Sequence, residues 1–181
     1  MERSEWIKSQ ARNQIETKYL QKLQGIVDSL KSIYIARKRN WNSLVLTFNG
    51  CSTVHWQVAF ICFSAAVEGI LTYEKGPGIA ERLAKSFACL TEKTKKKRDS
   101  AYRAFKHSYG IRSDIMHGRI VYSMVRGTVK LRELVKSSNL LRNLWKVILS
   151  SGSIMNELEK NDLERRNWFA KIEHGYNPPK I

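Results

Sequence analysis

Residues 54–73 read VHWQVAFICFSAAVEGILTY, and this stretch decides the fold. Its apolar side chains recur at helical spacing, and small residues at 65 and 66 allow another helix to approach closely. One face carries Phe60, Phe63, Val67, Ile70 and Leu71. The longest apolar run, residues 58–67, is about half as long as a membrane span. The stretch therefore predicts a buried helix of a soluble protein.

Five further segments show helical apolar spacing, namely residues 6–35, 79–90, 99–116, 129–149 and 154–172. Only three prolines occur, and two of them lie at 178 and 179. Residues 40–53 contain asparagines and a glycine, which favour a connection; within it, residues 44–46 form either a short strand or a turn of helix. We therefore expect an all-α fold, a helical bundle of about six helices.

The expected domain organisation has three parts. Residues 1–53 are an N-terminal helix and connection packed on the core, residues 54–175 are the helical core, and residues 176–181 are a flexible tail. The helix over residues 6–35 is either an added helix or a dimer arm.

Charge and cysteine usage narrow the class of protein. The chain has 32 basic and 16 acidic residues, a net charge of +16, which favours a polyanionic partner, nucleic acid first and an acidic protein next. No strongly basic amphipathic face stands out, so a membrane surface ranks last. Three cysteines without CxxC spacing predict neither a disulfide framework nor a zinc site. The polar N-terminus lacks a signal peptide's apolar region, so we expect a cytoplasmic protein.

Residues 109–118, YGIRSDIMHG, contain the side chains with the clearest chemical potential. The imidazole of His117 is suited to take up and release a proton near neutral pH. The guanidinium of Arg112 stays charged and presents a planar fork that fits phosphate oxygens. Cleavage of a phosphodiester needs both proton transfer and stabilisation of negative charge.

The spacing of these two residues limits how they act together. Five residues on a helix give a net rotation of about 140°, so Arg112 and His117 do not share a face. Either the helix ends near His117, which Gly118 permits, or two copies of the chain build the site around a two-fold axis. The plainer interpretation is a surface arginine and a helix-capping histidine, with Gly118 as the helix stop.

Three elements in order resemble the HEPN family, in particular its ApeA-like group. They are the tyrosine, arginine-serine and histidine-glycine pattern of residues 109–118, the glutamate-bearing apolar helix at residues 65–71, and the arginine-leucine-alanine helix start at residues 82–84. The resemblance covers residues 54–125. It implies a helical bundle, often a two-fold dimer, and a metal-independent endoribonuclease of toxin–antitoxin, CRISPR-associated or abortive-infection systems.

The resemblance also implies roles for individual residues. Arg112 and His117 match the catalytic positions, and Ser113 takes the polar second position. Asp114 either orients Arg112 or His117 or caps a helix. Glu68 is expected to be partly buried and to need a partner, for which Arg112 is a candidate; the alternative is a surface glutamate near the helix end.

A basic segment precedes the motif. Lys95, Lys96, Lys97 and Arg98 lie before it and Arg119 follows it. Such a positive region would hold RNA phosphates and make binding sensitive to salt; the alternative is a solvated loop.

We therefore expect an endoribonuclease that uses the ribose 2′-hydroxyl and needs neither metal nor cofactor. We expect it to be a homodimer that binds RNA. An antitoxin or regulatory protein is a further possible partner. The alternative function is a non-catalytic HEPN scaffold that binds RNA or a protein.

Overall fold

The computed structural model describes residues 3–35, 40–74, 76–119 and 127–179, with side chains from residue 19 in the first segment and from residue 131 in the last. These ranges contain helices and no strand, which confirms the all-α prediction. The helices are α1 (Arg3–Ile35), α2 (Asn40–Ser52), α3 (Trp56–Leu71), α4 (Ile79–Thr91), α5 (Lys95–Met116), α6 (Gly127–Leu149), α7 (Gly152–Leu158) and α8 (Asp162–Glu173).

The described ranges hold eight helices, two more than the sequence predicted. The prediction of one helix over residues 154–172 is wrong, because α7 ends at Leu158 and α8 begins at Asp162. Asn161 caps α8, and its side chain accepts a hydrogen bond from the Glu164 N–H at 3.0 Å. The remaining difference is α2, which replaces the expected connection.

Close helix packing explains why α2 was missed. Gly50 lies inside α2, where a Cβ atom would meet the Phe63 ring of α3 at 2.5 Å. Gly69 of α3 is equally confined, since its Cβ would lie 2.4 Å from the Ser43 hydroxyl of α2. Both glycines therefore serve the contact between two helices, and Gly50 does not mark a turn.

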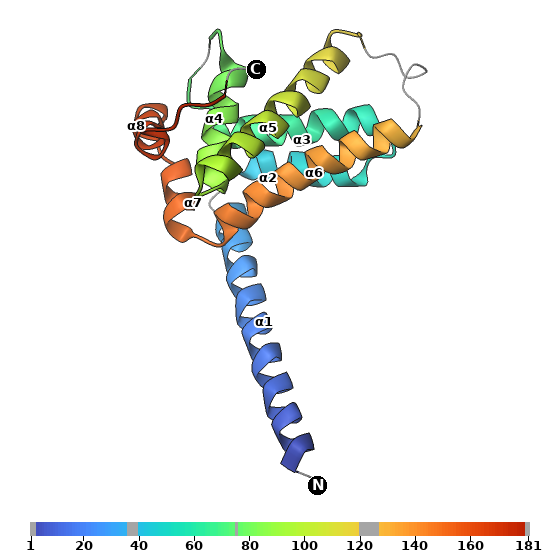
Figure 1. Cartoon of the computed structure of the whole chain (residues 1–181), viewed down its shortest axis with the longest axis vertical. Coiled ribbons are helices and arrows are strands. Elements are labelled where there is room, and N and C mark those ends of the chain that lie inside the picture. Colours follow the sequence, from blue (N-terminus) through green and yellow to red (C-terminus); the bar gives the residue numbers. More distant parts are fainter. Residues whose placement is uncertain (1–2, 36–39, 75, 120–126, 180–181) are drawn as a thin grey trace.

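Helix α3 is the central element of the core, as predicted. The five apolar residues of its predicted face are all buried, each at most 5% exposed. Helices α2, α5 and α6 pack around it, and α4 packs on α5 and α8 (Figure 1). A buried arginine holds the C-terminal end of α3. The Arg165 guanidinium of α8 donates hydrogen bonds to the Thr72 carbonyl, at 2.8 Å, and to the Ile70 carbonyl.

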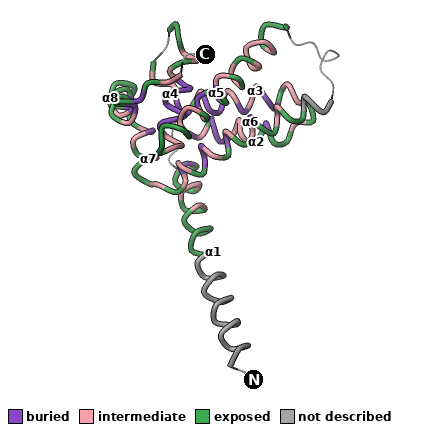
Figure 2. The backbone as a smooth tube through the Cα atoms, viewed as in Figure 1, coloured by how far each residue is buried: buried purple, intermediate pink, exposed green. Residues whose placement is uncertain are grey.

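The two ends of the chain differ in how they join this body. Helix α1 leaves it and projects outward, with most of its described side chains exposed (Figures 1 and 2). The C-terminal segment instead begins with a packed residue. Tyr176, which the sequence placed at the start of a flexible tail, is 4% exposed and donates a hydrogen bond to Asp99 at 3.1 Å.

Candidate functional site

The candidate site lies at the C-terminal end of α5, which continues through Gly110 without interruption. The helix ends in a glycine-based cap: Gly118 has a φ of +67°, its N–H donates to the Ile115 carbonyl at 3.1 Å, and the Arg119 N–H donates to the Asp114 carbonyl at 2.8 Å. This pattern satisfies carbonyls of the last turn that would otherwise lack partners. The helix thus ends with His117 at its C-cap and Gly118 as its stop, as the plainer interpretation of the motif expected.

Arg112 faces α3 and pairs with Glu68. Its Nη2 lies 3.2 Å from the Glu68 Oε1, and the two side chains are 27% and 21% exposed. The guanidinium also sits 5.3 Å from the centre of the Tyr109 ring, within the range of a cation–π contact. The pairing that the sequence suggested for Glu68 is therefore present, and the surface alternative for this glutamate is wrong.

Burial sets the electrostatics of this cluster. It raises the pKa of the Glu68 carboxyl, and the positive charge of Arg112 offsets only part of that rise. The pKa of the Tyr109 phenol is also raised, by burial first and by the Glu68 charge second. Within the described ranges the Glu68 Oε1 accepts no hydrogen bond, so the pair is held by charge at 3.2 Å. The remaining N–H groups of Arg112 are thus not committed to this carboxylate.

His117 occupies the C-cap position of α5, outside the Arg112 cluster. Its backbone N–H donates to the Ser113 carbonyl at 3.0 Å, while its side chain is exposed. The imidazole of His117 forms no hydrogen bond and no ion pair with any residue that the structure describes. Arg112 pairs with Glu68 of α3 and His117 lies at the exposed helix end, and no hydrogen bond joins these two side chains in the described structure.

Asp114 pairs with Arg119. Its Oδ1 lies 3.3 Å from the Arg119 Nη1. Asp114 therefore orients neither Arg112 nor His117 through a hydrogen bond in the described structure. Arg119, predicted to hold RNA, has part of its charge offset by this carboxylate, whereas Ser113 contributes its backbone carbonyl to the helix end.

The predicted basic segment lies at the opposite end of the same helix. Helix α5 begins at Lys95, four residues before the predicted start, so residues 95–98 form its first turn. A rise of 1.5 Å per residue puts them about 21–26 Å along the helix from Arg112 and about 29–33 Å from His117. Lys95 pairs with Asp99 at 2.8 Å, and Arg98 donates to the Glu92 carbonyl at 2.8 Å. The segment is helical and not a loop, but its lysines are exposed to solvent, as that alternative expected, and the structure does not bring the segment next to the motif.

One row of exposed residues links the two ends of α5. Lys96, Arg103, Gly110 and His117 recur every seven residues and are all exposed. Seven residues return a helix to nearly the same face, with a drift of about 20° per step. We call these four residues the α5 surface row. Arg103 was missed in the sequence, although its seven-residue spacing from Lys96 and Gly110 was a usable signal.

Two more residues near the motif have defined contacts. Tyr109 was quoted with the motif but given no role; its i, i+3 spacing to Arg112 was the signal for their contact. His107 had been weighed as a helper of the motif or a surface residue. It is exposed and pairs with Glu133 of α6 at 2.9 Å.

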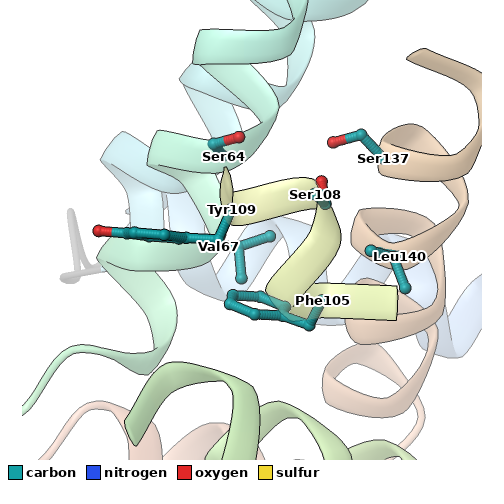
Figure 3. A pocket seen from close by; sticks show the side chains of 7 residues that line it. All are labelled: Ser64, Val67, Phe105, Ser108, Tyr109, Ser137 and Leu140. Carbon is teal, nitrogen blue, oxygen red and sulfur yellow. The ribbon is translucent and has the colours of Figure 1, made fainter. Parts of the chain in front are cut away.

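A small cavity lies behind Tyr109, between α3, α5 and α6. It has a volume of about 20 Å³, which is room for a single water. The hydroxyls of Ser64, Ser108 and Ser137 are directed toward this space, whereas the Tyr109 hydroxyl points away from it (Figure 3). A nucleotide does not fit in this cavity.

Among the described residues, no helix has both the length and the apolar character of a membrane span, and no group of three or more histidine, cysteine or acidic side chains is arranged to hold a metal ion. The chain gives no significant match to any protein-family model, curated protein or solved structure.

Proposed function

We propose that this protein is a metal-independent endoribonuclease of the HEPN type, with Arg112 and His117 as its catalytic residues. The observation that carries the proposal is the ion pair between Arg112 and Glu68. It joins two elements that the resemblance treats as separate, the glutamate-bearing helix and the arginine–histidine motif. The pair also fixes the direction of a guanidinium that keeps free donors for a phosphate.

The reaction is an intramolecular transfer within RNA. The ribose 2′-oxygen attacks the adjacent phosphorus, a new P–O2′ bond forms, and the P–O5′ bond breaks. The 2′-hydroxyl proton leaves to a base, and the departing 5′-oxygen gains a proton from an acid. His117 takes one of these two roles, and Arg112 stabilises the negative charge on the phosphoryl oxygens. The products are a 2′,3′-cyclic phosphate and a 5′-hydroxyl.

The α5 surface row supplies a route for the RNA strand. It extends over 22 residues from Lys96 to His117, a rise of about 32 Å, and carries two cations, the unobstructed position of Gly110 and the His117 imidazole. Neither Lys96 nor Arg103 forms a salt bridge with a described residue, so both charges are available to backbone phosphates. Binding along this row weakens as salt rises from 50 to 200 mM.

A second copy of the chain completes the site. Arg112 faces α3 and His117 lies at the exposed end of α5, so the histidine of one copy acts beside the arginine of the other. An isologous contact between two identical patches produces this arrangement twice.

The test is cleavage of a labelled single-stranded RNA in EDTA. Wild-type protein should cut it and leave cyclic-phosphate ends, whereas a DNA of the same sequence, which lacks the 2′-hydroxyl, should stay intact. His117→Ala should slow cutting about 10²–10⁴-fold and Arg112→Ala about 10²–10³-fold while RNA binding persists. His107→Ala is the matched control, because it removes another exposed imidazole from the same helix and should cut normally. Cut DNA, or equal cutting by His117→Ala, contradicts the proposal.

A non-catalytic RNA-binding scaffold is the second candidate. The observation that favours it is the separation of the two side chains, with Arg112 engaged by Glu68 and His117 at the exposed helix end. A scaffold binds RNA or an acidic antitoxin-like protein through the same surface row. It leaves RNA uncut at every protein concentration, and Lys96→Ala with Arg103→Ala reduces binding.

A further inference from the structure

An open groove runs along the C-terminal half of α6. It consists of two adjoining hollows, one of about 740 Å³ between α6 and α1, and one of about 360 Å³ between α6, α2 and α3. Arg142 and Trp145 line both hollows, which makes the groove continuous. Its α6 residues recur at three- and four-residue spacing from Ser138 to Ser150, a rise of about 18 Å, or about three turns. We call this feature the α6 groove.

The floor of the α6 groove is apolar. Ile26 and Leu149, both partly buried, line the larger hollow, and Leu141 lines the smaller one. Trp145 lies between them, is only 7% exposed, and donates a hydrogen bond from its indole N–H to the Thr47 hydroxyl at 2.9 Å. The indole is therefore held in place as part of the floor. Its ring does not present the open face on which a nucleic-acid base stacks.

The rim of the α6 groove is basic. Lys22, Arg142 and Lys146 line the larger hollow, and all three are exposed. Neither hollow is lined by an acidic residue. Arg142 donates to the neutral Asn139 side chain at 2.6 Å, and none of the three cations pairs with a carboxylate in the described part of the chain. The rim therefore combines an apolar floor with positive charges that lack a counter-charge.

We propose that the α6 groove binds an acidic amphipathic helix of a partner protein. A groove between helices is a common binding site for such a helix, which places apolar side chains at three- and four-residue spacing on the floor. Carboxylates on the flanks of the same helix then meet the cations of the rim. Laid along α6, the partner helix packs against α1 at one end of the groove and against α2 at the other.

Charge decides between this occupant and the others. A second copy of the chain carries a net charge of +16 and would bring like charge to the rim. The closing segment of the chain itself, residues 174–181, contains no acidic residue. RNA would match the cations but would leave the apolar floor uncovered. The proposal does not rest on the proposed function, because the groove lies at the α1 end of α6, away from the C-terminal end of α5 (Figure 1).

The test is the binding of a fluorescein-labelled synthetic peptide to the full chain, measured by fluorescence anisotropy at physiological salt. The peptide has about four helical turns, with leucines along one face and glutamates elsewhere. A second peptide has the same composition, but its leucines are distributed around the helix, so it has the same charge and no apolar face. We expect the first peptide to bind with a micromolar Kd and the second at least about tenfold more weakly. Equal binding would show only general attraction to a basic protein and would overturn the proposal.

Charge reversal then tests the rim. Arg142→Glu combined with Lys146→Glu should weaken binding of the first peptide at least about tenfold, with an unchanged circular dichroism spectrum. Lys96→Glu combined with Arg103→Glu is the matched control, because it reverses two exposed cations of α5 and changes the net charge by the same amount. This control should bind the peptide as the wild type does. An equal loss in both variants contradicts a site in the α6 groove.

A native cysteine reports where the peptide lies. Cys51 is exposed and lines the α6 groove, whereas Cys62 is partly buried and does not. Saturating peptide should slow the reaction of Cys51 with a maleimide and leave that of Cys62 unchanged, as measured by mass spectrometry. An unprotected Cys51 overturns the proposal.

The same rim variant separates the other occupants. If Arg142→Glu combined with Lys146→Glu binds single-stranded RNA less tightly, or differs from the wild type in mass during gel filtration, the groove belongs to RNA or to a second copy, and the proposal fails. We expect neither change, and we expect the variant to cut RNA as the wild type does. Failure of the nuclease proposal is therefore distinguishable from failure of this one.

Discussion

Helices α3 and α1 both carry apolar side chains at helical spacing, yet only the apolar face of α3 is covered. Seven of the sixteen α3 residues are buried under α2, α5 and α6. In α1 the described apolar side chains are mostly exposed, and Ile33 alone among them is fully buried. One helix organises the core, and the other extends from it (Figure 1).

The difference teaches that apolar periodicity predicts a helix without predicting what covers it. The two sequences differ in their small residues. Ala59, Ala66 and Gly69 let neighbouring backbones approach α3 closely, as the contact of Gly69 with Ser43 illustrates. The exposed apolar residues of α1 are all large, among them Leu20, Leu23 and Val27, and do not allow such a close approach.

Matched truncations should give the largest effect. Ile70→Ala removes a fully buried side chain from α3 and should lower the free energy of unfolding by about 2–5 kcal/mol. Leu23→Ala truncates an exposed residue of α1 and should change the free energy of unfolding by less than about 0.5 kcal/mol in dilute protein. Urea unfolding followed by circular dichroism measures both. If both variants lost the same free energy of unfolding in dilute protein, the apolar side chains of α1 would be covered within their own chain, and the contrast between α1 and α3 would be wrong.

The end of α3 should also be sensitive. Arg165 is fully buried, and its guanidinium satisfies two carbonyls at the C-terminal end of this helix. Arg165→Met keeps the bulk but leaves those carbonyls without their donor, so we expect a loss of about 2–3 kcal/mol. Arg166→Met is the control, because its neighbouring guanidinium is 60% exposed and lies 3.9 Å from Glu74. A loss shared by both variants would point to a general effect of charge.

The sequence predicted the class of fold and the core face of α3 because both depend on local periodicity. It missed α2 because Gly50 and the asparagines resemble turn signals. Their roles are tertiary: Gly50 allows contact with Phe63, and the Asn40 side chain donates to Glu159 at 2.7 Å. A single sequence does not separate a glycine that makes a turn from one that allows two helices to touch.

As with the fold, part of the candidate site could be predicted from the sequence. The pairing of Glu68 with Arg112 followed from one rule, that a buried carboxylate needs a partner. The position of the basic segment did not follow, because the helix start was placed at Asp99 instead of Lys95. Because the helix starts earlier, the lysines lie at the far end of α5, and Arg103 is an exposed cation between them and the motif. Catalysis, RNA binding and membership of the HEPN family remain predictions.

Two glycines of α5 should respond to alanine in opposite directions. Gly118 has a φ of +67°, which costs an alanine about 1–2 kcal/mol, so Gly118→Ala should lower the melting temperature by several degrees. Gly110 is helical, and an added Cβ meets nothing within 4 Å, so Gly110→Ala should raise stability by about 0.5–1 kcal/mol. Thermal unfolding measures both. A stable Gly110→Ala protein that binds RNA less tightly would support the surface row as the RNA route.

The smallest effect concerns Glu68, the one charged residue of α3. Burial raises the pKa of its carboxyl in the folded protein despite the Arg112 charge. The folded state therefore holds a proton that the unfolded state has released, and stability falls as pH rises from the unfolded pKa through the folded one. Glu68→Gln does not titrate. Its melting temperature should match that of the parent near pH 4 and exceed it at pH 8.

Glu81 provides a control of opposite sign. Burial tends to raise the pKa of Glu81, but hydrogen bonds from Lys106 and Tyr102 outweigh it and lower the pKa. Its stabilising effect is present above the unfolded pKa and is lost as pH falls through the folded one. Glu81→Gln should therefore be less stable than the parent at pH 8 and equal to it in acid. If Glu68→Gln follows this same trend, the ion pair with Arg112 stabilises the fold. If it instead gains stability at pH 8 and loses RNA cleavage, the carboxylate orients Arg112 at a cost in stability, as expected of a functional residue.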